Sequence, residues 1–150
     1  WTILTSMFMH SGLWHIIANM FTLYFLGTYL CNIISNARFL IVYFAGGLVG
    51  SFLYILFCLY TPLGNPNAVV IGASGAIFAV AGALTTLAPK MRVIVFPIPA
   101  PIPLWAAIIG GFLLISFLPG VAWQAHLGGL LVDLIAGYIF RRQRRNLFFY

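Results

Sequence analysis

A serine flanked by glycines and two well-separated histidines are the residues of this sequence whose types suit nucleophilic catalysis. Ser74 stands in the run Gly72-Ala73-Ser74-Gly75, where glycines let the backbone approach closely and leave amide donors exposed at a helix N-terminus. A serine nucleophile needs a base within hydrogen-bond reach and donors for the oxyanion that the reaction creates. His126 is the candidate base, and His15 is the alternative.

The composition predicts that these residues lie within a membrane. Of 150 residues, 63% are apolar and 5% are charged, and the mean hydropathy is +1.10. Soluble domains carry about 25% charged residues, so the sequence predicts one polytopic membrane domain. The net charge of +6 does not indicate nucleic-acid binding, because four of the seven cations lie in the C-terminal tail. We expect no cofactor and no metal.

Charges and clusters of proline and glycine divide the sequence into five expected membrane helices. Their approximate bounds are 12–34, 39–60, 74–88, 104–118 and 125–140. Before the fourth helix, alternating prolines from 97 to 103 lack amide donors and predict an extended loop. The start at Trp1, with neither a methionine nor a basic leader, suggests a fragment with a further span upstream.

Cations lie at alternate connections between these helices. Arg38 follows the first helix, Lys90 and Arg92 follow the third, and four arginines follow the fifth. The other connections hold no cation, so the positive-inside rule places the C-terminus in the cytoplasm. We therefore expect a multi-pass protein of the cell membrane. Cys31 and Cys58 would lie near opposite membrane faces and should not pair.

The same helices place four polar residues at a similar depth. At ~1.5 Å per residue, Ser74 and His126 lie roughly 24 and 22 Å from the next cation along their helices. Asn19 lies roughly 28 Å from its next arginine, and His15 shares its helix face because the two are four residues apart. One such serine or histidine is often structural. Four polar groups at one level in lipid indicate a site that opens to the extracytoplasmic side.

Three motifs of the sequence resemble those of the rhomboid family of intramembrane serine proteases. The family's His-x-x-x-Asn stands here as His15 to Asn19, preceded by His10, its Gly-x-Ser-Gly as Gly72 to Gly75, and its Ala-His-x-x-Gly as Ala125 to Gly129. The motifs occur in the family's order and span essentially the whole chain. The resemblance implies an all-α, six-helix bundle of which the second to sixth helices are present and the first is missing.

The resemblance also implies what the site residues do. Ser74 would be the nucleophile and His126 the base and then the acid, while His15, Asn19 and the Ser74 amide would form the oxyanion hole. Phe78 matches an aromatic position that packs on the catalytic histidine, and helix 104–118 matches the lateral gate. Gly72, Gly75 and Gly129 would support the site. The substrates would be single-span membrane proteins cleaved near the outer surface, and no feature predicts an oligomeric state.

Asp133 is the one acidic residue, and it stands where the family has a second glycine, four residues after Gly129. It follows His126 by seven residues, so it lies on nearly the same helix face but roughly 10 Å deeper. That distance is too great to orient the imidazole, and the sequence predicts a dyad. An unpaired carboxylate there costs about 2.5–3.5 kcal/mol on insertion scales, which makes Asp133 a doubtful packing position.

Two other classes of protein share some of these features. A non-catalytic rhomboid-like protein would bind transmembrane helices, and Asp133 favours this alternative, although such proteins typically lack the serine or the histidine. A small transporter or channel would carry polar groups near the membrane midplane and often an internal repeat. The sequence has no such repeat, and its polar groups lie near one membrane face. A serine endopeptidase is therefore the favoured function.

Overall fold

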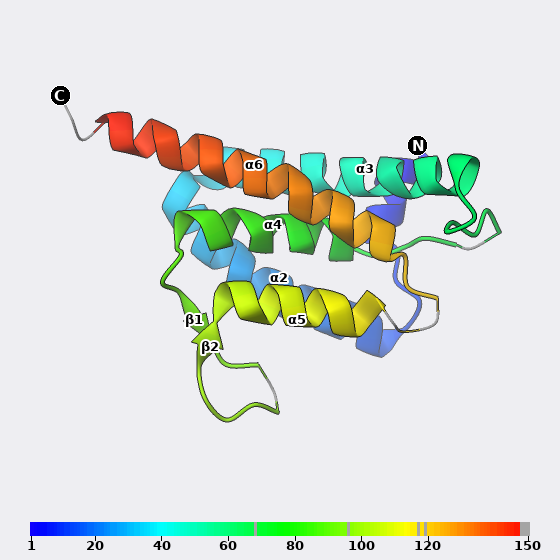
Figure 1. Cartoon of the computed structure of the whole chain (residues 1–150), viewed down its shortest axis with the longest axis horizontal. Helices are drawn as coiled ribbons and strands as arrows, with labels where there is room; N and C mark the ends of the chain where they lie inside the picture. The colour runs from blue at the N-terminus through cyan, green and yellow to red at the C-terminus, as the bar shows by residue number, and fades with distance from the viewer. Residues whose placement is uncertain (68, 96, 117, 119, 148–150) are drawn as a thin grey trace.

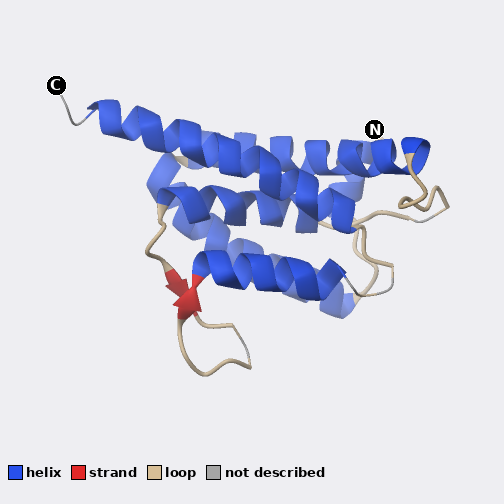
Figure 2. Ribbon diagram, viewed as in Figure 1, coloured by secondary structure: helices blue, strands red, loops and turns tan. Residues whose placement is uncertain are grey.

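The structure, a computed structural model, describes residues 1–67, 69–95, 97–116, 118 and 120–147, without the side chains of Ser116, Asp133 and residues 144–147. Its elements are α1 Thr2–Thr5, the 3-10 helix η1 Ser6–Phe8, α2 Leu13–Ile34, α3 Asn36–Tyr60, α4 Ser74–Leu87, β1 Arg92–Val93, β2 Ile102–Pro103, α5 Leu104–Ser116 and α6 Trp123–Leu147. The predicted mostly helical architecture is confirmed (Figure 2).

The structure adds two short helices, α1 and η1, before the first predicted helix, and it differs clearly from the predicted elements at two further places. Helix α6 continues to Leu147 rather than ending at 140, because arginines are good helix formers and Arg141 donates from Nη1 to the Thr86 carbonyl. The proline-rich stretch is not entirely loop. Its flanks form a short antiparallel ladder in which Arg92 pairs with Pro103, and the Arg92 side chain donates to the Pro101 carbonyl.

Helix α4 lies at the centre of the bundle. Every residue from Gly75 to Leu84 is buried, and α4 contacts α2, α3, α5 and α6 (Figure 1). Its most extensive contact is with α6. A Cβ at Gly129 would collide with the Gly75 carbonyl oxygen, and one at Gly82 would stand 3.0 Å from the Leu130 carbonyl oxygen. Small residues thus let the backbones of α4 and α6 approach each other closely.

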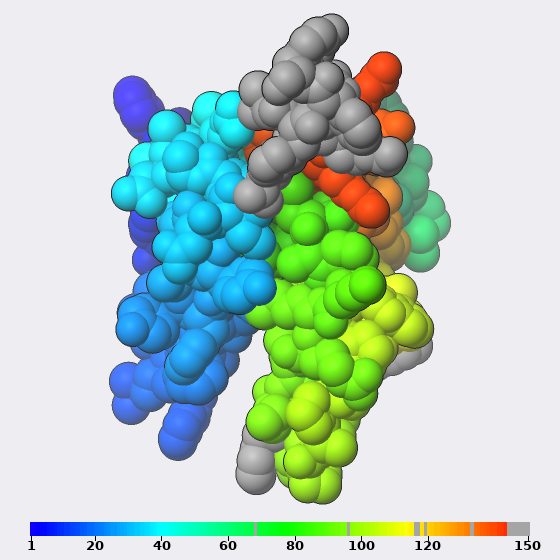
Figure 3. Space-filling view, turned by 90° about the vertical axis from the view of Figure 1, so that its left-hand side faces the viewer, coloured from blue at the N-terminus to red at the C-terminus, as the bar shows by residue number. Residues whose placement is uncertain are grey.

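The chain runs back and forth along the long axis, so its connections gather at two ends (Figure 1). Residues 61–67 and 69–73, residues 120–122 and the N-terminal segment share one end. The turn at Ser35, residues 88–95 and 97–103 and the C-terminal end of α6 share the other, which faces the viewer in Figure 3. The described cations belong to the second end or its approaches. They are Arg38, Lys90, Arg92, Arg141 and Arg142.

Two helices of the described part, α2 and α3, are long and apolar enough to cross a membrane by length and composition. Helices α4 and α5 are apolar but shorter. Cys31 on α2 and Cys58 on α3 are both free, which confirms that they do not pair.

Candidate active site

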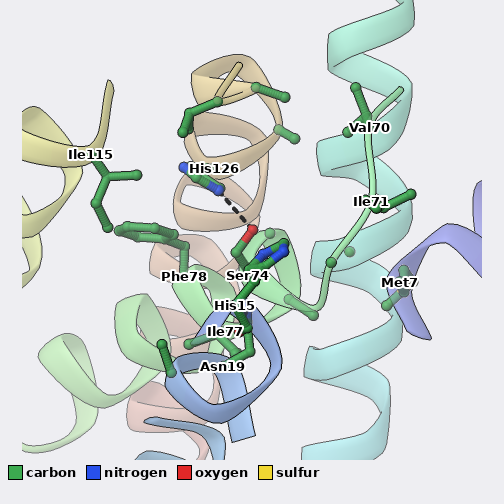
Figure 4. A pocket seen from close by; sticks show the side chains of 18 of the residues that line it. Met7, His15, Asn19, Val70, Ile71, Ser74, Ile77, Phe78, Ile115 and His126 are labelled. Carbon is green, nitrogen blue, oxygen red and sulfur yellow. Dashed lines mark hydrogen bonds between the residues drawn. The ribbon is translucent and has the colours of Figure 1, made fainter. Parts of the chain in front are cut away.

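The N-termini of α4 and α6 bring Ser74 and His126 into contact. Gly72 has a φ of 120°, a left-handed conformation that glycine adopts without strain and that turns the chain into α4. Ser74 is the first residue of α4, and His126 lies in the first turn of α6. The His126 Nε2 lies 2.7 Å from the Ser74 Oγ (Figure 4). This distance suits a hydrogen bond along which the hydroxyl proton passes to the imidazole.

The His126 ring is held by the Ser74 hydroxyl and by the aromatic ring of Phe78. Its side chain is 5% exposed, and the Phe78 ring packs on it with the centroids 4.7 Å apart and the planes 31° apart. Phe78 in turn meets Phe112 of α5 edge-on, at 6.0 Å between centroids. Within the described part of the chain, the His126 Nδ1 has no hydrogen-bond partner. The described side chains thus pair a serine with a histidine but give that histidine no orienting acid. The Asp133 side chain lies outside the described residues.

His15 and Asn19 extend from the first turns of α2 toward the same place (Figure 4). A Cβ on Gly72 would stand 2.8 Å from the His15 Nε2 and 3.8 Å from the Ser74 Oγ. The missing side chain of Gly72 therefore leaves room for the imidazole beside Ser74. Asn19 is 6% exposed, and its Nδ2 donates to the His15 carbonyl at 2.8 Å. One N–H of that amide remains for another acceptor.

A cavity of about 650 Å³ joins these residues. Its lining includes His15, Asn19, Ser74, Phe78 and His126, together with Leu26 of α2 and Ala107 and Gly111 of α5. Helices α2 and α5 barely contact each other within the described residues, and α2 and the segment 97–103 stand apart at the lower edge of Figure 3. The cavity therefore extends from Ser74 into the space between α2 and α5.

The structure adds three positions that the sequence motifs did not single out. The Gly72 amide donates to the Ser6 carbonyl at 2.9 Å, which ties the N-terminal segment to the turn before Ser74. The buried Gln124 donates from Nε2 to the Leu63 carbonyl at 2.7 Å and ties the start of α6 to the 61–73 connection. Ser11 bonds the His15 ring. Of Ser6, Ser11 and Gln124, only Ser11 could have been found from the sequence, because it precedes His15 by four residues, about one helical turn.

Comparison with known proteins supports the resemblance in the motifs. A family model described as the rhomboid domain matches residues 1–143. The chain is 31% identical over 167 residues to "Rhomboid protein 1, mitochondrial" of Saccharomyces cerevisiae, an alignment that covers 96% of this chain and 44% of the relative.

Two further relatives carry names that bear on activity. The chain is 38% identical over 92 residues to "Rhomboid protease GluP" of Bacillus subtilis, covering 61% of this chain and 17% of that protein. It is 32% identical over 131 residues to "Inactive RHOMBOID-like protein 8" of Arabidopsis thaliana, covering 87% of this chain and 35% of that protein. This chain thus spans less than half the length of these relatives. No solved structure matches. Because the family model covers nearly the whole chain, the chain belongs to the membrane-embedded rhomboid family.

Proposed function

We propose that this chain is the catalytic domain of an intramembrane serine endopeptidase that cleaves single-span membrane proteins, with Ser74 as nucleophile and His126 as general base. The observation that carries the proposal is the 2.7 Å contact between the Ser74 Oγ and the His126 Nε2. The contact lies at the wall of a cavity large enough for an extended peptide segment. The comparisons support it through the relative named as a protease.

The reaction proceeds in two stages. The Ser74 Oγ attacks the scissile carbonyl carbon as its proton passes to the His126 Nε2, and the resulting imidazolium gives that proton to the amine as the C–N bond breaks. This leaves an acyl ester on Ser74. In the second stage, water gives a proton to Nε2 and attacks the ester, and the proton then returns to the Ser74 Oγ as the free acid forms.

Three donors are available for the oxyanion that forms in both stages. Ser74 begins α4, so its N–H has no partner within the helix and lies at the positive end of the helix dipole. His15 and the remaining amide N–H of Asn19 line the same cavity. Preorganised donors of this kind are worth about 2.7–4 kcal/mol each in serine proteases.

Phe78 stabilises the imidazolium that His126 becomes during the reaction. A cation over an aromatic face gains about 0.5–2 kcal/mol, and the Phe78 ring packs on the His126 ring. We expect Phe78→Leu to lower the cleavage rate by roughly tenfold. Phe78→Tyr retains an aromatic ring at this position and should leave the cleavage rate unchanged. The measurement is initial rates of reporter cleavage in vesicles. Equal rates for the leucine and tyrosine variants would contradict this role.

The surface of the chain supports a location within the bilayer. Large apolar side chains are exposed along α2 and α3, while the polar side chains of Asn19 and His126 are buried. Soluble monomers rarely expose large contiguous apolar patches. The exposed residues include Trp14, Phe21, Tyr24, Ile41, Phe52 and Leu59. We propose that α2 to α6 cross the cell membrane with the cation-bearing end in the cytoplasm. The active site then opens to the other side, and substrates enter between α2 and α5.

The orientation predicts opposite labelling at the two ends of the bundle. In a background with Cys31→Ala and Cys58→Ala, we expect Asn67→Cys to react with a membrane-impermeant maleimide on intact cells. Arg142→Cys should react only after the cells are permeabilised. Asn67 and Arg142 are both exposed and lie at opposite ends of the molecule. Labelling of Arg142→Cys on intact cells would overturn the orientation.

Position 133 lies on α6 midway between two glycines that contact α4. A Cβ at Gly129 would collide with the Gly75 carbonyl, and one at Gly137 would stand 2.9 Å from the Ala83 carbonyl oxygen. We expect Asp133→Gly to raise the free energy of unfolding at neutral pH by about 2 kcal/mol, because a carboxylate no longer has to be accommodated in the membrane. Thermal unfolding in detergent, followed by tryptophan fluorescence, measures the difference. An unchanged or lower stability would mean that the carboxylate is paired in the folded protein.

The function itself is tested with a single-span reporter that is co-reconstituted with the protein in lipid vesicles. We expect one internal cut in the reporter, absent with Ser74→Ala. The alternative, a non-catalytic protein that binds transmembrane helices, is favoured by Asp133 and by the relative named inactive. This alternative predicts that the parent chain and Asp133→Gly both bind the reporter and that neither cleaves it.

A further inference from the structure

The His15 ring is in hydrogen-bond contact with Ser11, four residues before it. The Ser11 backbone N–H donates to the His15 Nδ1 at 3.3 Å, and the Ser11 Oγ lies 3.0 Å from the same nitrogen. Helix α2 begins at Leu13 with Gly12 as its N-cap, so His15 is the third residue of the helix. In a capping box, a glutamate or glutamine at this position reaches back to the backbone N–H of the N-cap residue. Here the histidine reaches one residue further back, to the N–H of Ser11.

This contact bears on which ring nitrogen of His15 carries the proton. A backbone N–H can only donate, so the His15 Nδ1 must be the acceptor and carry no proton. The neutral ring then carries its proton on Nε2, because one ring nitrogen donates when the other accepts. The imidazolium form would set an Nδ1–H against the Ser11 N–H. The Ser11 contact therefore favours the neutral ring protonated on Nε2.

The Nε2 that carries this proton belongs, with the neighbouring Cε1, to the ring edge that faces the Gly72 turn before Ser74. Both atoms stand 2.8 Å from the point where a Gly72 Cβ would lie, and the Ser74 Oγ is 3.8 Å from that point. The ring is held on another side by His10, whose ring meets it edge-on at 5.1 Å between centroids and 70° between planes. The His15 imidazole is thus held in place by Ser11 and His10, and the Ser11 contact favours the Nε2–H tautomer.

We propose that Ser11 is a positioning residue that holds His15 in the Nε2–H tautomer and so directs a donor at the oxyanion beside Ser74. The proposal rests on the oxyanion role given to His15 under the proposed function. It identifies Ser11 as the residue that orients the His15 proton for that role. Without Ser11, the ring has two neutral tautomers, and in one of them Nε2 faces the oxyanion with a lone pair. In a serine protease whose catalytic histidine has the wrong tautomer, kcat falls about 10⁴-fold with the geometry intact.

Nitrogen-15 NMR reads the tautomer directly, without any need for activity. The chain has three histidines, so a histidine-labelled sample of the protein in detergent micelles gives signals from three rings. Those of His15 are identified by their loss in His15→Ala. We expect the His15 Nδ1 at a pyridine-type shift and Nε2 at a pyrrole-type shift at neutral pH. A pyrrole-type Nδ1, or two protonated nitrogens, would overturn the proposal.

Variants of Ser11 then connect the tautomer to the reaction. Ser11→Ala removes the nearer contact and leaves the backbone N–H, 3.3 Å away, as the one Ser11 donor to the His15 Nδ1. We therefore expect a less firmly held ring and a second tautomer in the His15 signals beside the Nε2–H form. The limiting rate of labelling by a fluorophosphonate probe should fall about tenfold, less than the 10²–10³-fold that loss of a whole oxyanion donor costs, with the half-saturating probe concentration unchanged. Ser11→Thr should restore both readouts. Thr5→Ala is the matched control, because it removes a hydroxyl of the same segment that bonds only carbonyls of its own turn.

The outcomes separate this inference from the proposed function. If Ser11→Ala is labelled as fast as the parent while His15→Ala is slow, His15 acts in the reaction but Ser11 does not position it, and the proposal is overturned. If His15→Ala is labelled as fast as the parent, the oxyanion role of His15 fails, and with it the positioning role of Ser11. The spectrum of the parent still decides the tautomer in that case.

Discussion

His126→Ala should lower the rate of cleavage of a single-span reporter by about 10⁶-fold, the loss measured when the base of a serine protease is removed. His15, the alternative base, is not free to take the Ser74 proton, because its Nδ1 accepts from the Ser11 N–H and the same contact favours a protonated Nε2. The serine and the histidine act as a unit. We therefore expect Ser74→Ala, His126→Ala and the double variant to lose similar amounts of activity.

The control for this prediction is Gln124→Ala, which removes another buried side chain of the same helical turn. Gln124 ties α6 to the 61–73 connection through the Leu63 carbonyl, so its loss reports what disturbance of this region alone does to the rate. We expect a fall of less than about tenfold, equivalent to a single neutral hydrogen bond. A His126→Ala variant that retains more than about a hundredth of the parent rate would require another base, since general acid–base catalysis supplies about 10²–10⁴-fold.

Gly129→Ala should lower the free energy of unfolding by about 3 kcal/mol, the upper end of the usual cost of overpacking. The new methyl group would collide with the Gly75 carbonyl oxygen and lie 3.0 Å from the Gly75 carbonyl carbon. Backbone atoms cannot rotate away as a flexible side chain can, so α4 and α6 must separate. Gly75 follows Ser74 and Gly129 lies one turn after His126, so the separation should lengthen the Ser74–His126 contact and slow cleavage as well.

A matched glycine on α5 gives the comparison for this variant. A Cβ at Gly110 would meet no atom within 4 Å, and alanine is the better helix former by up to about 1 kcal/mol. Gly110→Ala should therefore leave the unfolding temperature in detergent unchanged or raise it. If Gly129→Ala unfolds at the same temperature as Gly110→Ala, the close approach of α4 and α6 at Gly75 does not hold the fold together.

The sequence predicts the parts of this fold that depend on local pattern. Long apolar runs bounded by charges and prolines mark the helices. Counting residues along helices from Lys90 and Arg141 places Ser74 and His126 at one level, because an α-helix has a fixed rise per residue. In the structure these two side chains lie within hydrogen-bond distance. Depth arithmetic places residues along the helices but does not say which helices are neighbours.

Contacts made by backbone groups are what the sequence does not reveal. The Ser6 carbonyl bonds the Gly72 amide, and any residue type at position 6 offers the same carbonyl. Gly50 in α3 closely approaches Gly128 in α6, and a Cβ added to Gly128 would stand 2.8 Å from the Gly50 Cα. This contact depends on the tertiary arrangement of the two helices. The ends of helices are equally hard to predict. The arginines from which the sequence predicts the end of a membrane helix lie within α6, which continues to Leu147.

Labelling with a fluorophosphonate probe tests most directly whether Ser74 is an activated nucleophile, since it needs no knowledge of the substrate. The purified chain in lipid vesicles should form one covalent adduct, which mass spectrometry places on Ser74. Ser74→Ala and His126→Ala should form none, because the first lacks the nucleophile and the second the base that takes its proton. If the folded parent and Asp133→Gly both remain unlabelled, the serine is not activated, and the chain is a rhomboid relative that does not catalyse proteolysis.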